Sequence, residues 1–146
     1  MNPARAPGSR VLSLALRNDR RELARIGESV ERFGGQCQLT SDDTAQINLM
    51  LDELVSNVIK YGYDEAGEHQ IDVTVGVDAD RITISVEDDG KPFNLLEAPP
   101  PNFDLSIEQR PVGGLGVFLV RSIADAVDYR RDGNRNVVTL TKKRRA

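Results

Sequence analysis

Residues 51–63 read Leu-Asp-Glu-Leu-Val-Ser-Asn-Val-Ile-Lys-Tyr-Gly-Tyr and contain the second half of a long predicted helix together with the glycine that ends it. An apolar residue recurs every three or four positions, at Ile47, Leu51, Leu54, Val58 and Tyr61. This spacing places them on one helical face, which we expect to pack against a core. The sequence Ser-Asp-Asp at residues 41–43 offers N-cap candidates and Gly62 stops the pattern, so the helix is predicted over residues 44–61.

Glu53 and Asn57 lie one turn apart on this helix, at the edge of its apolar face. A carboxylate and a carboxamide at the rim of a cleft are suited to accept a proton and to bind a hard cation such as Mg²⁺ through oxygen. The alternative is that both are ordinary solvated surface residues. The spacing alone does not decide between the two interpretations.

The composition restricts the class of protein. The 146 residues are 39% hydrophobic and 29% charged without a long uncharged apolar run, so we expect one domain, no transmembrane helix and no secretory signal. Cys37 is the single cysteine, which excludes an internal disulfide and fits a reducing compartment, so the expected location is cytoplasmic. The net charge of -4 and the dispersed basic residues give no sign of a nucleic-acid surface.

Periodicity along the chain predicts one compact α+β unit. Alternating apolar and polar residues predict strands at residues 11–16, 71–75, 82–88, 127–130 and 138–141. Helical spacing predicts one helix over residues 20–33, ended by Gly34 and Gly35, and another that begins near Val117. The first of these helices carries arginines among glutamates, which fits a solvated face or a partner surface. We expect a loose leader over residues 1–10, a domain over 11–143 and a solvated basic tail over 144–146.

Strand parity singles out one carboxylate. Asp88 continues the alternation that runs through Ile84 and Val86, so its side chain is predicted to face the core, whereas Asp89 faces the other way. A carboxylate on the core side costs several kcal/mol unless it accepts hydrogen bonds. An amino group of a bound ligand is one candidate donor. The alternative is an ordinary Asp-Asp-Gly turn with both carboxylates in solvent.

A long segment with four prolines, residues 94–112, precedes a cluster of glycines. A loop of this length is typical of a functional lid or of disorder. Residues 113–116 read Gly-Gly-Leu-Gly and open the next predicted helix, where backbone N–H groups and the helix dipole favour a phosphate. The alternative is that these glycines allow tight packing at the helix start.

Three signals occur in the order Glu-x-x-x-Asn on a helix, Asp-x-Gly after a strand, and Gly-x-Gly opening a helix. Together they resemble the GHKL or Bergerat ATP-binding fold of gyrase, histidine kinases and MutL. Residues 88–94 (Asp-Asp-Gly-Lys-Pro-Phe-Asn), 110–116 (Arg-Pro-Val-Gly-Gly-Leu-Gly) and 133–138 (Gly-Asn-Arg-Asn-Val-Val) are similar to the anti-sigma regulatory factors of the RsbW and SpoIIAB type. The resemblance implies a two-layer α/β sandwich, with a mixed and mostly antiparallel sheet covered on one face by helices.

The resemblance also implies roles for individual residues. Glu53 matches the general base, Asn57 the magnesium ligand, and Asp88 the carboxylate that accepts a hydrogen bond from the adenine amino group. Gly90 matches the glycine that lets the turn approach the base. A lid that faces the phosphates is matched by Gly114, Leu115 and Gly116. The implied cofactors are ATP and Mg²⁺.

The implied activity is a serine/threonine protein kinase that phosphorylates a STAS-domain anti-anti-sigma protein and sequesters a sigma factor. The resemblance further implies a homodimer, with no direct contact to nucleic acid or membrane. Two alternatives remain at this point: a non-catalytic nucleotide-binding anti-sigma clamp, and a histidine-kinase-like ATPase domain. The chain contains no Gly-x-x-x-x-Gly-Lys-[Ser/Thr] loop and no His-Arg-Asp or Asp-Phe-Gly motif, which argues against P-loop and eukaryotic-type kinases.

Overall fold

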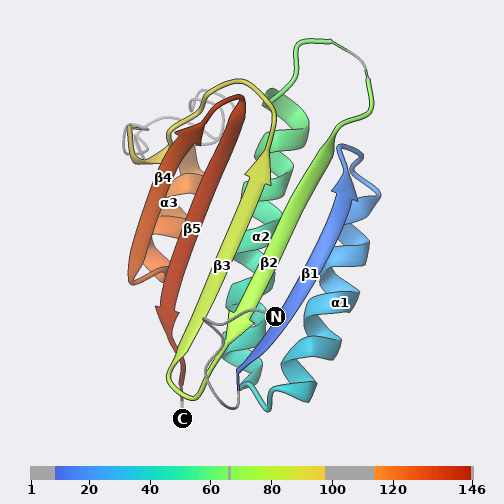
Figure 1. The fold of residues 1–146 in the computed structure, drawn as a ribbon. Coiled ribbons are helices and arrows are strands. Elements are labelled where there is room, and N and C mark those ends of the chain that lie inside the picture. Colours follow the sequence, from blue (N-terminus) through green and yellow to red (C-terminus); the bar gives the residue numbers. More distant parts are fainter. Residues whose placement is uncertain (1–8, 66, 98–113, 146) are drawn as a thin grey trace.

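The structure, a computed structural model, describes residues 9–65, 67–97 and 114–145. Within these residues one sheet is formed by β1 (Arg10–Arg17), β2 (Gln70–Val77), β3 (Arg81–Asp88), β4 (Ala126–Asp132) and β5 (Arg135–Lys143). The helices α1 (Glu22–Gln36), α2 (Ser41–Tyr61) and α3 (Gly114–Ile123) cover one face of that sheet (Figure 1). A short 3-10 helix, η1 (Leu95–Glu97), follows β3.

The sheet order is β1-β2-β3-β5-β4, and each neighbouring pair is antiparallel. The predicted α+β class with two layers is therefore confirmed. The expectation of a mixed sheet is wrong for the described strands, because none of their pairings is parallel. The predicted β2–β3 and β4–β5 hairpins account for two of the four pairings, since consecutive strands joined by short turns pair antiparallel.

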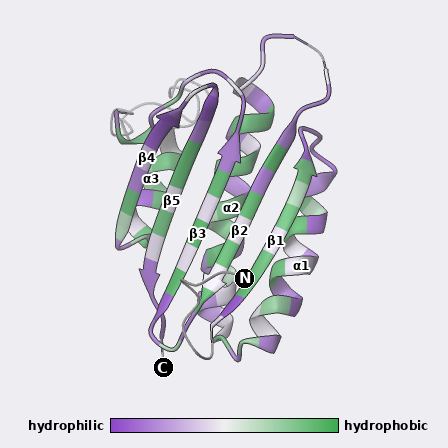
Figure 2. Cartoon of the chain, in the orientation of Figure 1, coloured by the Kyte–Doolittle hydropathy of each residue, from purple (hydrophilic) through white to green (hydrophobic). Residues whose placement is uncertain are grey.

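The core lies between the sheet and the helices. Figure 2 shows that hydrophobic and hydrophilic residues alternate along the strands, so that one face of the sheet is apolar. The buried strand residues include Ile71, Val73, Val75, Ile82, Ile84 and Val86. From α2, the residues buried in the same cluster include Ile47, Met50, Leu51, Leu54 and Val55. This packing holds α2 along the sheet and brings its C-terminal end to the end of β3, where Lys91 N donates to Gly62 O (2.8 Å).

α2 begins earlier than its apolar pattern predicts. The N-cap is Thr40, outside the predicted candidates at residues 41–43, and its side chain accepts a hydrogen bond from Asp43 N (3.1 Å). The helix ends at Tyr61 with Gly62 as its C-cap, as the sequence predicts. The cap could not be chosen from sequence, since four successive residues all have suitable side chains.

The glycine pair near the end of α1 does not terminate the helix, which continues to Gln36. Gly34 is buried against α2, where an added Cβ would lie 2.5 Å from Oγ1 of Thr44. Glycine at this position therefore allows α1 and α2 to approach closely. The predicted helix end at residues 34–35 is wrong for this reason.

The basic residues at the C-terminal end of β5 are held by the fold. Lys142 is 8% exposed, and its Nζ lies 3.2 Å from Oδ1 of the fully buried Asp43. The guanidinium of Arg144 donates to the carbonyl of Cys37 (2.6 Å), and the backbone N–H of Arg145 donates to Oδ2 of Asp43 (2.8 Å). The expectation of a solvated tail is therefore wrong for Arg144, which is half-buried. Arg145 is exposed, as expected, although its backbone N–H ties it to the start of α2.

Parts of the predicted organisation lie outside the described residues. These are most of the leader (residues 1–8), most of the predicted lid (residues 98–113) and residue 146. No helix in the described ranges is long and apolar enough to span a membrane.

Candidate functional site

A cavity of about 400 Å³ opens between α2, the end of β3 and α3. Its apolar lining includes Leu54, Val58, Val86, Leu95, Val117 and Val138. Its polar lining includes Asn57, Asp88, Lys91 and Asn136, and Tyr61 and Phe93 also contribute. The volume falls within the roughly 300–1,000 Å³ typical of small-molecule sites, which combine apolar walls with a few placed polar groups.

Asp88 contributes a carboxylate to the lining of this cavity. It is the last residue of β3 and is 4% exposed, on the core side that strand parity predicts. Its Oδ1 accepts hydrogen bonds from the backbone N–H of Gly90 (2.9 Å) and from Nδ2 of Asn136 (2.9 Å). Within the described chain no donor reaches its Oδ2. The interpretation of Asp88 as a solvent-facing turn residue is therefore wrong.

Asn136 is a site residue that sequence reasoning missed. It lies opposite Asp88 in the β3–β5 register and is also 4% exposed. The available signal was the same parity argument, because Asn136 shares the core-facing side of β5 with Val138 and Leu140. A buried amide needs partners as a buried carboxylate does. Asn136 finds one of them in Asp88.

Glu53 and Asn57 lie on α2 beside the cavity, but they are not equivalent. Asn57 lines the cavity together with Asp88, whereas Glu53 does not. The carboxylate of Glu53 lies against the first turn of α3, where a Cβ added to Gly116 would overlap it. Neither side chain hydrogen-bonds to another described residue. Glycine at 116 is therefore explained by close packing against Glu53, and a phosphate-facing role for it stays a prediction.

Of the other glycines predicted for the site, the surroundings of Gly90 are described in the structure and those of Gly114 are not. Gly114 and Leu115 belong to the first turn of α3, but their surroundings lie outside what the structure describes. Gly90 is buried against the C-cap of α2, where an added Cβ would lie 2.7 Å from the carbonyl oxygen of Gly62. Glycine at 90 thus lets the turn after Asp88 pack on the end of α2.

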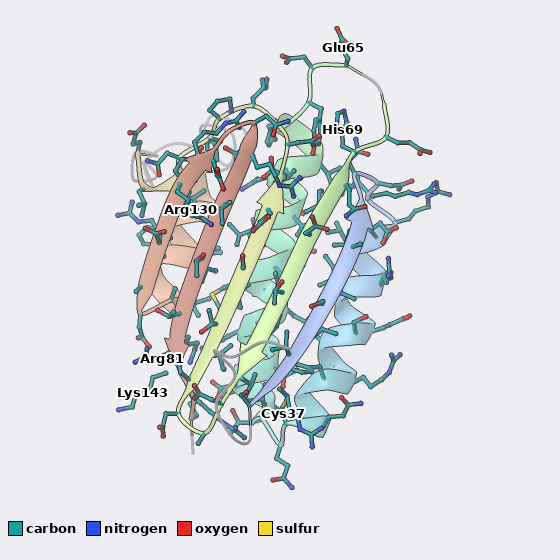
Figure 3. The ribbon with its side chains drawn as sticks, in the orientation of Figure 1. Cys37, Glu65, His69, Arg81, Arg130 and Lys143 are labelled. Atoms are coloured by element: carbon teal, nitrogen blue, oxygen red, sulfur yellow. The ribbon has the colours of Figure 1, made fainter. Side chains whose placement is uncertain are left out.

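Asp89 points away from the cavity into a second polar cluster. Its carboxylate accepts a hydrogen bond from the hydroxyl of Tyr63 (3.0 Å) and lies 3.2 Å from Nδ1 of His69. The rings of Tyr63 and His69 stack with their centroids 4.0 Å apart. Burial alone would raise the pKa of Asp89, but the hydrogen bonds from His69 and Tyr63 hold this pKa below its ordinary value. Figure 3 shows His69 at the end of the sheet opposite to Arg81 and Lys143.

The donor set beside the cavity fits Mg²⁺ that arrives with a nucleotide. In the described ranges no three His, Cys, Asp or Glu side chains are grouped to hold a metal ion. Glu53 and Asn57 offer one carboxylate and one amide oxygen from a single helix. Mg²⁺ characteristically takes one or two protein oxygens and completes its shell with phosphates and water.

Comparison with solved structures shows the same fold in two groups of proteins. The RsbU and RsbW domains of a Mycobacterium tuberculosis protein match with a TM-score of 0.63 at 15% identity, over 94% of this chain and 33% of that chain. The blue-light activated histidine kinase of Erythrobacter litoralis matches with a TM-score of 0.54 at 16% identity, over 84% of this chain and 40% of that chain. At these identities the likeness concerns the fold alone.

Sequence comparison is more specific. The chain is 30% identical over 118 residues to the serine-protein kinase RsbW of Halalkalibacterium halodurans, covering 78% of this chain and 71% of that protein. It is 29% identical over 106 residues to the serine-protein kinase RsbW of Bacillus mycoides, covering 69% of this chain and 64% of that protein. Residues 16–142 match the histidine kinase-like ATPase domain family. The chain belongs to this family of ATPase domains, and within it to the relatives of the RsbW serine-protein kinases.

Proposed function

We propose that the chain is an ATP-dependent serine kinase that acts as an anti-sigma regulatory factor. Its substrate is a serine of a STAS-domain anti-anti-sigma protein, and its second partner is a sigma factor. The observation that carries this proposal is the buried Asp88 carboxylate in a largely apolar cavity that Asn57 also lines, from α2. Such a cavity suits a flat base with an amino group, bound with its phosphates toward α3.

The base-binding end of the proposed site relies on one free acceptor. Oδ1 of Asp88 is occupied by two protein donors, so Oδ2 is left for an amino group of the ligand. Asp88 is 4% exposed and lines the cavity, so a ligand that fills the cavity and shields this oxygen from water must donate to it, because an unpaired buried carboxylate is costly. The apolar walls contributed by Val58, Val86 and Val138 supply the contact surface for the ring.

The phosphate end of the proposed site is the region between α2 and the start of α3. The N-terminus of a helix attracts phosphate through its free N–H groups and its dipole, which suits the Gly-Leu-Gly turn at residues 114–116. Asn57, with Glu53 beside it, would hold Mg²⁺, which when bound neutralises charge on the phosphate oxygens. Glu53 would accept the proton of the seryl hydroxyl. Phosphoryl transfer depends mainly on positioning and electrostatics, so these few groups suffice.

We assign further properties of the RsbW group to the chain as part of the same proposal. The kinase would work as a homodimer in the cytoplasm, where both the sigma factor and its antagonist are found. The exposed arginines at the start of α1, Arg20 and Arg21 in the turn before the helix and Arg25 on it, form a suitable partner surface. Sedimentation velocity of the purified chain, which gives its molar mass in solution, tests the dimer directly.

The test of the activity is phosphoryl transfer in a defined mixture. The purified chain, Mg²⁺ and γ-labelled ATP are incubated with candidate STAS proteins, and the product is analysed for phosphoserine. Glu53→Ala should lose the transfer but still bind ATP, because Glu53 lies outside the cavity that holds the base. Label on a histidine, which acid removes and base spares, would favour a histidine-kinase-like domain. ATP binding without any transfer would favour a non-catalytic clamp.

A further inference from the structure

We propose that Asn136 is a positioning residue that fixes the orientation of the Asp88 carboxylate and so sets the preference of the cavity for a base with an amino group. This inference rests on the proposed function, since it concerns the same nucleotide site. Asn136 touches the cavity wall from β5 and is nearly fully buried. It acts on the ligand through Asp88.

The contacts of Asn136 determine which way its amide points. Nδ2 faces three acceptors: Oδ1 of Asp88 (2.9 Å), the carbonyl of Lys91 (2.8 Å) and the carbonyl of Gly90 (3.5 Å). Both of its N–H groups are therefore used on the turn that follows β3. The reverse orientation of the amide would set its oxygen against a carboxylate and two carbonyls. The hydrogen-bond network thus assigns the nitrogen to this side.

The other end of the amide meets only donors. Its Oδ1 accepts from the hydroxyl of Tyr129 (2.6 Å), from Nη1 of Arg131 (3.2 Å) and from the backbone N–H of Phe93 (3.4 Å). Arg131 also donates to the carbonyl of Gly90 (2.8 Å). The β4–β5 hairpin is therefore hydrogen-bonded to the turn after Asp88 at several points. Asn136 is the residue through which Tyr129 and Arg131 act on the carboxylate.

This network has a consequence for the ligand. Oδ1 of Asp88 is saturated by Gly90 and Asn136, and the amide oxygen of Asn136 is saturated by its own donors. Of the acceptor oxygens of Asp88 and Asn136, the Oδ2 of Asp88 is thus the one left for a ligand. A base with an amino group, such as adenine, can donate to this atom. A base with a carbonyl at the same place, such as hypoxanthine, would set oxygen against oxygen, which is unfavourable in a buried site.

Loss of the amide should therefore change selectivity as well as affinity. Without Asn136 the carboxylate keeps one donor and can rotate, so its second oxygen is no longer held toward the ligand. The repulsion between this oxygen and the carbonyl oxygen of a base such as hypoxanthine should decrease at the same time. A purely structural role would instead lower stability or weaken all nucleotides equally.

The experiment measures the dissociation constants of Mg-ATP and Mg-ITP by calorimetry, together with the thermal midpoint of each variant. Asn136→Ala is the main variant. Tyr129→Phe removes the hydroxyl that holds the amide oxygen but keeps the ring, and serves if Asn136→Ala folds poorly. Thr139→Ala is the matched control, since Thr139 lies on the same strand with its side chain toward the opposite face of the sheet.

We expect Asn136→Ala to raise the dissociation constant of Mg-ATP about tenfold and that of Mg-ITP much less, so that the preference for ATP falls. Tyr129→Phe should shift the ratio in the same direction by a smaller factor, and Thr139→Ala should leave it unchanged. An unchanged ATP-to-ITP ratio in folded Asn136→Ala and Tyr129→Phe would overturn the role of Asn136 while leaving ATP binding intact. Failure of the wild-type chain to bind ATP would overturn the proposed function and this inference with it.

Discussion

Asp88 brings a carboxylate into an apolar cavity, where an unpaired charge would cost several kcal/mol. Two donors offset this cost: the backbone of Gly90 and the amide of Asn136. Both bonds go to the same oxygen, so the fold stabilises the carboxylate without using all of its acceptor capacity. At the residue scale, the second oxygen of Asp88 is therefore available to accept a hydrogen bond from a ligand.

Glu53 and Gly116 make the second close contact at this scale, and they give a prediction for activity. Gly116→Ala would place a methyl group on the Glu53 carboxylate, which must move because the glycine backbone cannot. Since the displaced group is the end of a flexible side chain, the fold should survive. We expect the rate of phosphoryl transfer to fall by about tenfold or more, as misplaced catalytic groups commonly cause.

The matched control for this variant is Gly27→Ala, because Gly27 is a helical glycine with open space at its Cβ position. Its transfer rate should equal that of the wild type. Retention of the full rate in Gly116→Ala would argue that Glu53 is not placed by this contact.

Sequence reasoning succeeded at the residue scale where one local rule was enough. Asp88 was predicted to face the core because successive side chains of a strand alternate between its two faces. The partner of Asp88 comes from a strand 48 positions later, and no local pattern specifies that Asn136 would lie opposite it. Glu53 was correctly placed on the helix edge, but its contact with Gly116 depends on how α3 packs.

At the element scale, the crossing of α1 and α2 depends on one glycine. Gly34 sits against Thr44 so closely that a Cβ would meet Oγ1, Cγ2 and Cβ of that threonine within 3.3 Å. A threonine side chain is too short to swing away from such a contact. The two helices can therefore pack at this distance only with glycine at 34.

Alanine substitutions at the adjacent glycines should have opposite effects on stability. Gly34→Ala should lower the free energy of unfolding by about 1–3 kcal/mol, as overpacking does. Gly35→Ala is the control, since Gly35 is exposed in the same helix with nothing near its Cβ position. It should raise the free energy of unfolding by about 0.5–1 kcal/mol through helix propensity. Urea unfolding measures both, and equal effects of the two variants would contradict this account of the helix crossing.

This pair of glycines also explains an error in the sequence analysis. A Gly-Gly pair at the end of an apolar helical pattern is a normal termination signal. The same pair permits close helix packing, and only the position of α2 decides between the two uses. Local propensity therefore located α1 but did not fix its end, which is the usual limit of periodicity as a guide.

At the scale of the whole molecule, the end of β5 is tied to the start of α2 by a buried ion pair. Asp43 is fully buried, and Lys142 is its partner at 3.2 Å. Without Lys142, the buried Asp43 carboxylate would keep the backbone N–H of Arg145 and the half-exposed Arg145 guanidinium at 3.9 Å, but would lose its buried cation. The C-terminal end of the last strand is thereby joined to the start of α2 in the helix layer.

Replacement of Lys142 should therefore destabilise the fold far more than replacement of its neighbour. Lys142→Met should lower the free energy of unfolding by about 3 kcal/mol or more, because Asp43 loses its buried partner. Lys143→Met is the control, since Lys143 is exposed and its side chain points the other way. Its effect should stay within about 0.5 kcal/mol. Thermal unfolding of the two variants compares them, and similar midpoints would speak against a structural role for the pair.

Stability at acid pH should depend on the cluster of Asp89, Tyr63 and His69. The pKa of Asp89 is lower in the folded state than its ordinary value of 3.8, so the carboxylate contributes stability above that value. This contribution is lost as the pH falls through the lowered pKa, when Asp89 takes up a proton. The difference in unfolding free energy between wild type and Asp89→Asn should thus shrink as the pH is lowered from about 5 to about 2. Denaturant titrations at several pH values measure it, and a constant difference would contradict the assignment.

The sequence predicted the architecture of the whole molecule well, because each strand and helix has its own periodicity and the hairpins have short turns. It did not predict the docking of the C-terminal basic residues. Arg144 reaches the carbonyl of Cys37 from a position 107 residues away, and a run of basic residues has no pattern that distinguishes this from solvation. Contacts between distant segments depend on the assembled fold.

The most direct test of the account is the binding of Mg-ATP to three versions of the chain: wild type, Asp88→Asn and Asp89→Asn. The two aspartates are adjacent in sequence, but Asp88 lines the cavity and Asp89 points into the cluster with Tyr63. Calorimetry at neutral pH should find ATP bound by the wild type and by Asp89→Asn with similar affinity, and no measurable binding to Asp88→Asn. Equal binding by all three, or equal loss in both variants, would contradict the placement of the nucleotide against Asp88.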